Sequence, residues 1–232
     1  MRETNLTAVL LDPILQRDPA GPRITHYDDA TGARIELSAL TLANWAAKTA
    51  NFIRDEFGLD PGARAAILLP PHWQSAGVYL GAWWAGLEVT LDPEADADVA
   101  FVTAAGLDSV DAPEVVVLSL DAFGRPVPNL PVGVTDYATS VRVHGDRFSA
   151  TVASAALEGR DVGSVLAEAR DSAERQGISS SDRVLSANDW ATPDTIIDNL
   201  LAVYAAGASL VQVSNSEDPN RHAAAERVTK SL

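Results

Sequence analysis

The sequence carries one pattern twice, and this repeat constrains the fold more than any other feature. Each copy predicts an amphipathic helix, a short apolar strand, a second helix and another apolar strand, with a glycine after each helix. The first copy covers residues 41–91 and the second covers residues 161–213. The corresponding glycines lie 119 residues apart (Gly58 and Gly177) and 121 residues apart (Gly86 and Gly207). This matched spacing predicts two related α/β layers with right-handed crossovers.

In the first copy, Thr41 is expected to cap a helix whose apolar residues recur at helical spacing as far as Phe57. Residues 63–69 form a continuous apolar run, which is typical of a strand in the middle of a parallel sheet. Residues 73–85 are apolar on almost every side, so this second helix is expected to be buried. The strand 87–91 completes the unit.

The second copy is predicted to begin with a helix near Asp161, followed by the strand 183–187. Thr192 and Pro193 predict a capped start for its second helix, because proline is favoured in the first helical turn. The strand 208–213 ends the copy. Six residues after the first glycine of each copy stands an arginine, which is expected to occupy an equivalent place in the two layers: Arg64 and Arg183.

The remaining segments are shorter and less regular. Extended runs at residues 24–27 and 34–37 surround a turn and predict a hairpin. Loops are expected to dominate between Pro113 and Gly133, where proline and glycine are dense. The other expected elements are three strands at residues 99–103, 115–118 and 141–143 and a helix at residues 218–230.

Composition restricts the class of protein. The 232 residues carry a net charge of −15 and a pI near 4.5, which argues against nucleic acid or an anionic membrane as partner. The simpler interpretation of the acid excess is a soluble surface. The sequence has no cysteine, so disulfides, thiolate metal sites and cysteine nucleophiles are excluded. The N-terminal residues do not resemble a signal peptide and no apolar run is long enough for a membrane span, so we expect a cytoplasmic protein.

Two stretches resemble the N-terminal region of the AMP-binding (adenylate-forming) superfamily of acyl-CoA synthetases, peptide-synthetase adenylation domains and luciferases. Residues 40–93 (LTLANWAAKTANFIRDEFGLDPGARAAILLPPHWQSAGVYLGAWWAGLEVTLDP) are similar to its opening helix, strand, helix and strand. Residues 177–213 (GISSSDRVLSANDWATPDTIIDNLLAVYAAGASLVQV) are similar to its second subdomain. The chain also resembles short actinobacterial proteins of this length. The resemblance implies an α/β fold of two related sheet-and-helix subdomains, residues 1–139 and 140–232, packed as one globular unit.

The sequence also departs from the family in ways that affect activity. The family's phosphate loop, roughly T-S-G-T-T-G-x-P-K-G, corresponds to residues 152–161, where only a displaced Gly159 remains and Glu158 adds negative charge. Glycines in such a loop let backbone N–H groups approach phosphates. In the family, a ribose-binding aspartate and a small lid domain with a catalytic lysine lie beyond the position of residue 232. We therefore expect no adenylation activity and no nucleotide cofactor.

Four residues are candidate ligand contacts. Asp189 falls where adenylation domains have a Phe-Asp pair whose aspartate holds the substrate amine, although Asn188 replaces the phenylalanine here. The alternative is that Asn188 and Asp189 only form a turn. His72 and Trp73 follow the first strand of one copy, and Trp190 follows the equivalent strand of the other. The carboxyl ends of such strands commonly bind ligands. The two tryptophans could wall a flat ligand, or they could anchor the core as most buried aromatics do.

Other kinds of site receive no support from the sequence. The acidic run between Asp92 and Asp98 lacks the glycine and the final glutamate of a calcium loop, so an acidic loop facing water is expected. The histidines show no spacing suited to a metal, and no catalytic metal is predicted.

Function is therefore expected to be non-catalytic. The leading hypothesis is a truncated relative of adenylate-forming enzymes that binds a small molecule or a protein partner. Two alternatives remain open: one half of a split acyl- or aminoacyl-adenylating ligase, and an ATP-independent enzyme that uses the cleft between the subdomains. No recognisable set of acid, base and nucleophile favours the enzyme alternatives, and fold analogy by itself does not assign a function.

Overall fold

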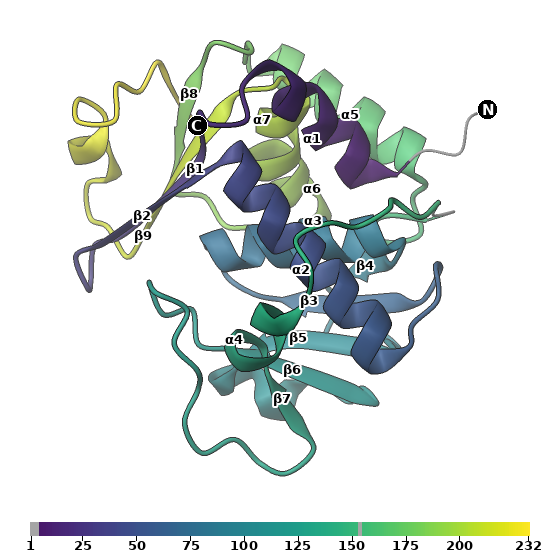
Figure 1. Ribbon diagram of the computed structural model, residues 1–232. Helices are drawn as coiled ribbons and strands as arrows, with labels where there is room; N and C mark the ends of the chain where they lie inside the picture. The colour runs from purple at the N-terminus through teal and green to yellow at the C-terminus, as the bar shows by residue number, and fades with distance from the viewer. Residues whose placement is uncertain (1–4, 153–154) are drawn as a thin grey trace.

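The structure is a computed structural model that describes residues 5–152 and 155–232, and in this part of the chain it contains two five-stranded sheets with helices between and around them (Figure 1). The helices are α1 (Leu6–Arg17), α2 (Ala39–Phe57), α3 (Trp73–Ala85), α4 (Tyr137–Ser140), α5 (Val162–Arg175), α6 (Pro193–Ile196) and α7 (Ala202–Ala205). Short 3₁₀ turns are η1 (Ala104–Ser109), η2 (Val141–Val143) and η4 (Pro219–His222), and η3 (Ile197–Leu201) is a π-helical segment that joins α6 to α7.

The first sheet, called sheet A, has the strand order β10-β8-β9-β1-β2. Its strands are parallel except for the antiparallel β1–β2 hairpin. The second sheet, sheet B, has the order β4-β3-β5-β6-β7 and is parallel throughout. The strands of sheet A are β1 (Pro22–Asp28), β2 (Ala33–Ser38), β8 (Arg183–Ser186), β9 (Ser209–Ser214) and β10 (Lys230–Ser231). Those of sheet B are β3 (Arg64–Leu68), β4 (Glu88–Thr90), β5 (Val99–Thr103), β6 (Glu114–Leu118) and β7 (Val134–Asp136).

The repeat is confirmed at the level of element order. The first copy forms α2, β3, α3 and β4, and the second forms α5, β8, the α6–η3–α7 helix and β9. Arg64 and Arg183 open the equivalent strands β3 and β8, as predicted. Gly58 and Gly86 end their helices in the left-handed conformation, at φ 64° and φ 86°, which glycine adopts without the steric penalty of a side chain.

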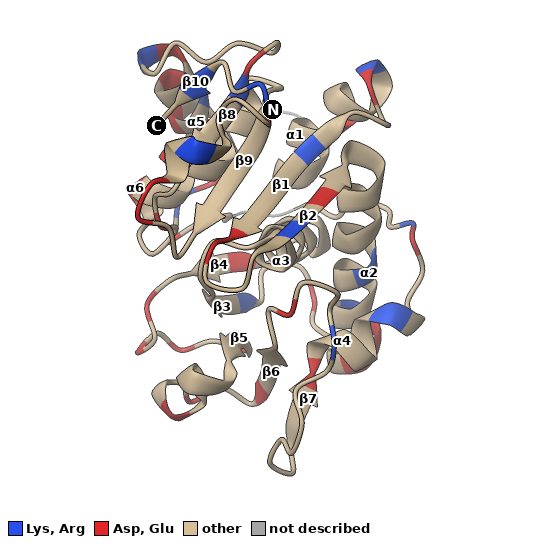
Figure 2. Ribbon diagram, turned by 90° about the vertical axis from the view of Figure 1, so that its left-hand side faces the viewer, with Lys and Arg blue, Asp and Glu red and all other residues tan. Residues whose placement is uncertain are grey.

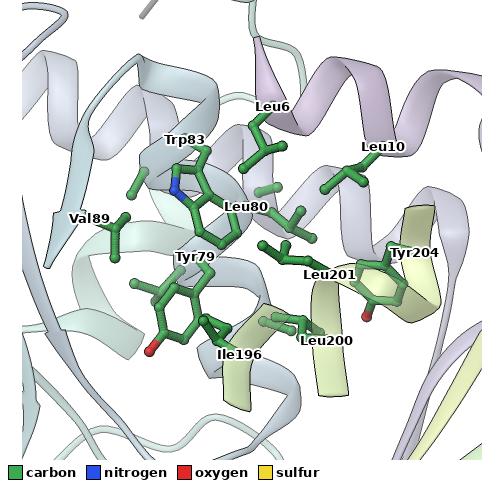
Figure 3. Close-up of a cluster of buried hydrophobic side chains, with 14 of the residues drawn as sticks. Leu6, Leu10, Tyr79, Leu80, Trp83, Val89, Ile196, Leu200, Leu201 and Tyr204 are labelled. Carbon is green, nitrogen blue, oxygen red and sulfur yellow. The ribbon is translucent and has the colours of Figure 1, made fainter. Parts of the chain in front are cut away.

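The helix α3 lies between the two sheets and joins them into one core (Figure 1). It contacts β1 of sheet A and both β3 and β4 of sheet B. Figure 3 shows how side chains from α1, α3 and the α6–η3–α7 helix meet around it: Leu6, Leu10, Tyr79, Leu80, Trp83, Leu200 and Leu201. Each of these side chains is at most 2% exposed. The expectation that residues 73–85 form a buried helix is therefore confirmed.

The two sheets do not divide the chain at residue 139. The β1–β2 hairpin comes from the N-terminal part of the chain but belongs to sheet A, because β1 pairs with β9 from Ile24–Leu210 to Asp28–Ser214. The C-terminal segment is held to the same hairpin by Glu226, whose carboxylate accepts hydrogen bonds from the Tyr27 hydroxyl and from Arg34 Nε at 2.8 Å. The division into the subdomains 1–139 and 140–232 thus stays a prediction, while sheet A draws strands from both ranges.

Several local predictions were wrong. Residues 141–143 form the 3₁₀ turn η2 instead of a strand. The tail expected to be a helix from residue 218 to 230 has only the short turn η4 before the strand β10. The cap of α2 is Ser38, whose hydroxyl accepts a hydrogen bond from the Thr41 amide, so the helix begins two residues before Thr41.

Among the elements that were not predicted are α1 and β7. The helix α1 is capped by Asn5, whose side-chain oxygen accepts a hydrogen bond from the Ala8 amide, and it continues past Pro13. The strand β7 has three residues, too few for a periodicity to be visible in the sequence.

Acidic residues lie in the loops next to β5, β6 and β7 (Figure 2). In the described residues, none of the helices has the length and apolar character that a membrane crossing requires.

Candidate binding cleft

A cleft of about 1490 Å³ opens at the carboxyl ends of strands from both sheets. Sheet B contributes the segments that follow β3 and β6, which include His72 and the loop 119–126. Sheet A contributes the β1–β2 hairpin, Asp189 after β8, and residues 212–217 at the end of β9. The carboxyl ends of parallel strands are the usual ligand sites of open α/β sheets.

His72 lies in the wall of this cleft and caps α3. Its Nδ1 accepts a hydrogen bond of 3.1 Å from the Gln74 amide, so the neutral ring carries its proton on Nε2. The side chain is 5% exposed, and burial lowers the pKa of His72 to about 3. The imidazole is therefore neutral at pH 7 and provides a polar group without charge.

A second neutral histidine touches the first. The rings of His26 and His72 lie 4.4 Å apart, edge to face, although the two residues come from different sheets. Burial lowers the pKa of His26 to about 4, and its Nε2 is 3.1 Å from the Ser214 hydroxyl. His26 was not among the contact residues predicted from the sequence, because its contact with His72 depends on how the two sheets pack.

Gln212 is the register partner of His26 on the adjacent strand β9 and also lines the cleft. The residue is 1% exposed. Its Nε2 donates a hydrogen bond of 3.2 Å to the Asn188 carbonyl, but its Oε1 accepts none from the described residues. A buried amide oxygen without a donor costs about 1–3 kcal/mol, so this group has unused capacity to accept a hydrogen bond.

The loop 119–126 forms one side of the cleft and is fixed by its own hydrogen bonds. The Asp121 carboxylate accepts from the amides of Phe123 and Arg125 and from the Arg125 guanidinium. These bonds, led by the one from the Arg125 side chain, lower the pKa of Asp121 to about 2. Arg142 adds a bond of 2.6 Å to the Gly124 carbonyl. Phe123 sits on this loop with 76% of its surface exposed.

The charged groups of the cleft are mainly acidic. Its lining contains the carboxylates of Asp28, Asp121, Asp189 and Glu217 and the guanidiniums of Arg34 and Arg125. Both guanidiniums already pair with carboxylates: Arg34 with Glu36 and Glu226, and Arg125 with Asp121. The electrostatic potential of the cleft therefore disfavours an anionic ligand.

The structure separates the four candidate contact residues into two groups. His72 and Asp189 line the same cleft. Asp189 is exposed, and its carboxylate also accepts a hydrogen bond of 3.0 Å from the Ala191 amide in the turn before α6. Trp73 and Trp190 are core residues, 3% and 1% exposed. Trp73 packs against Trp45 and Trp190 packs against Tyr79, with ring centres 5.2 and 6.3 Å apart.

The segment predicted to correspond to the phosphate loop, residues 152–161, packs against β4 of sheet B where the structure describes it. Ala153 and Ser154 lie outside the described residues, but Ala156 and Leu157 are buried at 1% and 0% exposure. The Ala156 carbonyl accepts hydrogen bonds from the Val89 amide at 2.9 Å and from Trp83 Nε1 at 2.8 Å. Leu157 forms a parallel bridge with Val89, which adds the segment to the edge of the sheet.

Glu158 and Gly159 complete this attachment. The Glu158 carboxylate accepts hydrogen bonds from the Leu91 amide at 2.6 Å and from the Thr90 hydroxyl at 3.1 Å. The Gly159 amide donates to the Glu88 carboxylate at 2.8 Å. Nearby cations are also engaged, since Arg64 pairs with Glu88 and Arg160 pairs with Glu168. The polar groups of the segment therefore form hydrogen bonds that attach it to the edge of sheet B.

Among residues 5–152 and 155–232 there is no group of three or more His, Cys, Asp or Glu side chains placed to hold a metal ion.

Comparisons with solved structures define the fold. The fold matches a Brucella canis acyl-CoA synthetase (TM-score 0.79, 17% identity, 98% of this chain and 47% of that chain). It also matches the anthranilate CoA ligase AuaEII in complex with anthranoyl-AMP (TM-score 0.72, 13% identity, 90% and 45%) and a benzoate CoA ligase from Burkholderia xenovorans LB400 (TM-score 0.70, 16% identity, 90% and 45%). The chain has the fold of the adenylate-forming enzymes and spans about half the length of these ligases.

Sequence similarity then identifies the family. No family profile matches the chain. It is 54% identical over 240 residues to a TIGR03089 family protein from Mycobacterium tuberculosis, with 99% of this chain and 98% of that protein covered. The chain belongs to the TIGR03089 family. The predicted fold, that of the N-terminal region of AMP-binding enzymes, is confirmed.

Proposed function

We propose that this protein is a non-catalytic relative of the adenylate-forming enzymes that binds a small molecule in the cleft between its two sheets. The observation that carries the proposal is the attachment of residues 155–160 to β4. A phosphate loop has to present free backbone N–H groups to the nucleotide. In this segment, the Glu158 amide donates to the Val89 carbonyl and the Gly159 amide donates to the Glu88 carboxylate.

Electrostatics supports the same proposal. Transfer of a phosphoryl or adenylyl group needs cationic or metal stabilisation of the charge on the phosphates. Glu158 brings a carboxylate to this position, and the neighbouring Arg64 and Arg160 are paired with glutamates. A polyphosphate would therefore meet a negative charge and would have to break existing ion pairs to find a positive one.

The cleft supports a binding role because it remains open although the phosphate-loop segment is packed. Its volume of about 1490 Å³ is larger than the roughly 300–1,000 Å³ of typical small-molecule pockets. Its lining combines apolar groups, such as Phe123 and Ile35, with a few buried polar side chains.

Titration calorimetry with ATP and magnesium tests the absence of nucleotide binding. We expect no heat of binding at affinities tighter than about 1 mM. A benzoate CoA ligase titrated under the same conditions is the positive control. A dissociation constant in the micromolar range for this protein would contradict the proposal, because it would require a phosphate site that the packed segment does not provide.

One alternative has an observation in its favour. The chain spans 45–47% of the length of the ligases that share its fold, which suits one half of a split acyl- or aminoacyl-adenylating ligase. In that case a second chain would have to supply the phosphate contacts as well as the lid. Adenylation that appears only when such a chain is added would favour this alternative.

A further inference from the structure

We propose that the cleft selects an uncharged or cationic ligand that has an N–H donor and a flat apolar part, and that Phe123 is the residue that holds the apolar part. This inference rests on the proposed small-molecule binding and adds the chemical class of the ligand. Three independent features of the cleft lead to it: its charge, its buried acceptor and its exposed aromatic ring.

The charge of the cleft disfavours anionic ligands. Asp189 and Glu217 carry no salt bridge to a cation of the described residues, while Arg34 and Arg125 are both paired. The two histidines in the wall are neutral at pH 7 and do not compensate. A carboxylate ligand would therefore be repelled by unpaired carboxylates and would gain no ion pair. A neutral amide would not be repelled, and an ammonium ion would gain an ion pair.

The buried acceptor selects a donor. Gln212 is 1% exposed, lines the cleft, and has an Oε1 that accepts no hydrogen bond within the described residues. The Asn188 carbonyl oxygen lies 3.2 Å from the present Nε2. If the amide were flipped, its oxygen would face this carbonyl oxygen and the hydrogen bond would be lost. The hydrogen bond to Asn188 thus fixes the acceptor role of the other atom. This oxygen is covered in the free protein, so a ligand N–H reaches it when the groups that cover it move aside, and the new hydrogen bond then removes the cost of leaving it unpaired.

Phe123 offers the apolar contact. It is 76% exposed although its loop is held by the bonds of Asp121 and by Arg142, so the ring is presented at a fixed place on the cleft wall. A rigid aromatic side chain loses little entropy when a flat group stacks on it, which makes it an efficient binding surface. The same loop contains Leu120 in the left-handed conformation, at φ 52°. A residue with a bulky side chain rarely adopts this conformation, so the backbone of the loop is held by its surroundings.

Four probes that share one ring test the three features separately by NMR titration of the ¹⁵N-labelled protein. Benzamide is neutral with N–H donors, N,N-dimethylbenzamide lacks the donors, benzylamine is a cation, and benzoate is an anion. We expect benzamide and benzylamine to shift resonances of cleft residues with dissociation constants of about 1–10 mM, and benzoate and N,N-dimethylbenzamide to bind at least about tenfold more weakly.

The variant Phe123→Ala should weaken benzamide binding by about three- to tenfold without changing the melting temperature, because the ring is exposed in the free protein. Val132→Ala, which removes another fully exposed apolar side chain outside the cleft, is the matched control and should change nothing. Benzoate binding as tightly as benzamide, equal binding of the dimethylated amide, or no binding of any probe would each overturn the inference.

The outcome is separable from that of the proposed function. ATP binding together with the expected probe preferences would refute the non-catalytic proposal and leave the ligand class standing. No ATP binding together with a preference for benzoate would refute the proposed ligand class and leave the non-catalytic proposal standing.

Discussion

His72 illustrates how one residue serves both the fold and the cleft. Its Nδ1 satisfies an amide at the start of α3, and its buried ring contacts His26 from the other sheet. The sequence predicted that His72 follows a strand at the ligand-binding edge, and it does lie in the cleft wall. Its capping role was not predicted, since histidine is an uncommon N-cap residue.

The protonation of His72 predicts a specific dependence of stability on pH. Burial depresses its pKa to about 3, compared with about 6.5 in the unfolded chain. Below pH 6.5 the unfolded state therefore binds a proton that the folded state does not, and stability falls as the pH falls toward 3. The variant His72→Asn keeps a capping oxygen and removes the titrating group.

Urea denaturation at pH 7 and pH 4.5 measures this effect. Between these values the wild type should lose about 2–3 kcal/mol more of its free energy of unfolding than His72→Asn. His26 titrates in both proteins, although its contact with residue 72 couples the two pKa values in the wild type. Equal losses would mean that His72 is accessible to protons in the folded state.

At the scale of elements, the helices and strands that were predicted correctly are those whose sequence pattern lies within the element itself. Both copies of the helix–strand–helix–strand unit have long apolar runs and terminal glycines, and both were predicted. The strand β7 and the turn η2 have three residues each, so their conformation is decided by their neighbours. The C-terminal tail ends in a strand and not in the predicted helix, because Thr229 and β10 pair with β8.

The candidate site was predictable to a similar extent. His72 and Asp189 were found because they follow strands, and that position alone indicates the edge of a sheet. Gln212, His26 and Phe123 could not be found in this way. Their importance depends on an unpaired atom, on a contact between two sheets and on an exposed ring in a fixed loop, all of which arise only after folding.

The segment 155–160 provides a prediction at this scale. Leu157 is completely buried against β4, so Leu157→Ala should lower the free energy of unfolding by about 2–4 kcal/mol. Val152, 45% exposed on the same connection, is the matched control, and Val152→Ala should change stability by less than about 0.5 kcal/mol.

Hydrogen exchange adds an independent measure of the same packing. The Glu158 amide, which donates to the Val89 carbonyl at 3.0 Å, should be protected to a degree comparable with the amides of β3. Rapid exchange together with a small effect of Leu157→Ala would mean that the segment is free, and the argument against a phosphate loop would fail.

At the scale of the whole molecule, the two sheets share one core around α3, and sheet A combines strands from both ends of the chain. This arrangement explains why the cleft has polar groups from both sheets on its walls. It also separates the cleft from the segment 155–160, which is attached to the edge of sheet B and does not line the cleft. Binding in the cleft therefore does not require a phosphate loop.

The measurement that most directly tests the central claim is ATP–pyrophosphate exchange with a panel of acyl and amino acids. Adenylation with any acid would incorporate labelled pyrophosphate into ATP, whatever the later fate of the adenylate. With Glu158 in place and the segment packed, exchange should remain at the background of a protein-free sample for every acid, while a benzoate CoA ligase supplied with benzoate gives a clear signal. Exchange above background with even one acid, abolished by heat denaturation of the protein, would contradict the proposal that this protein does not activate acids.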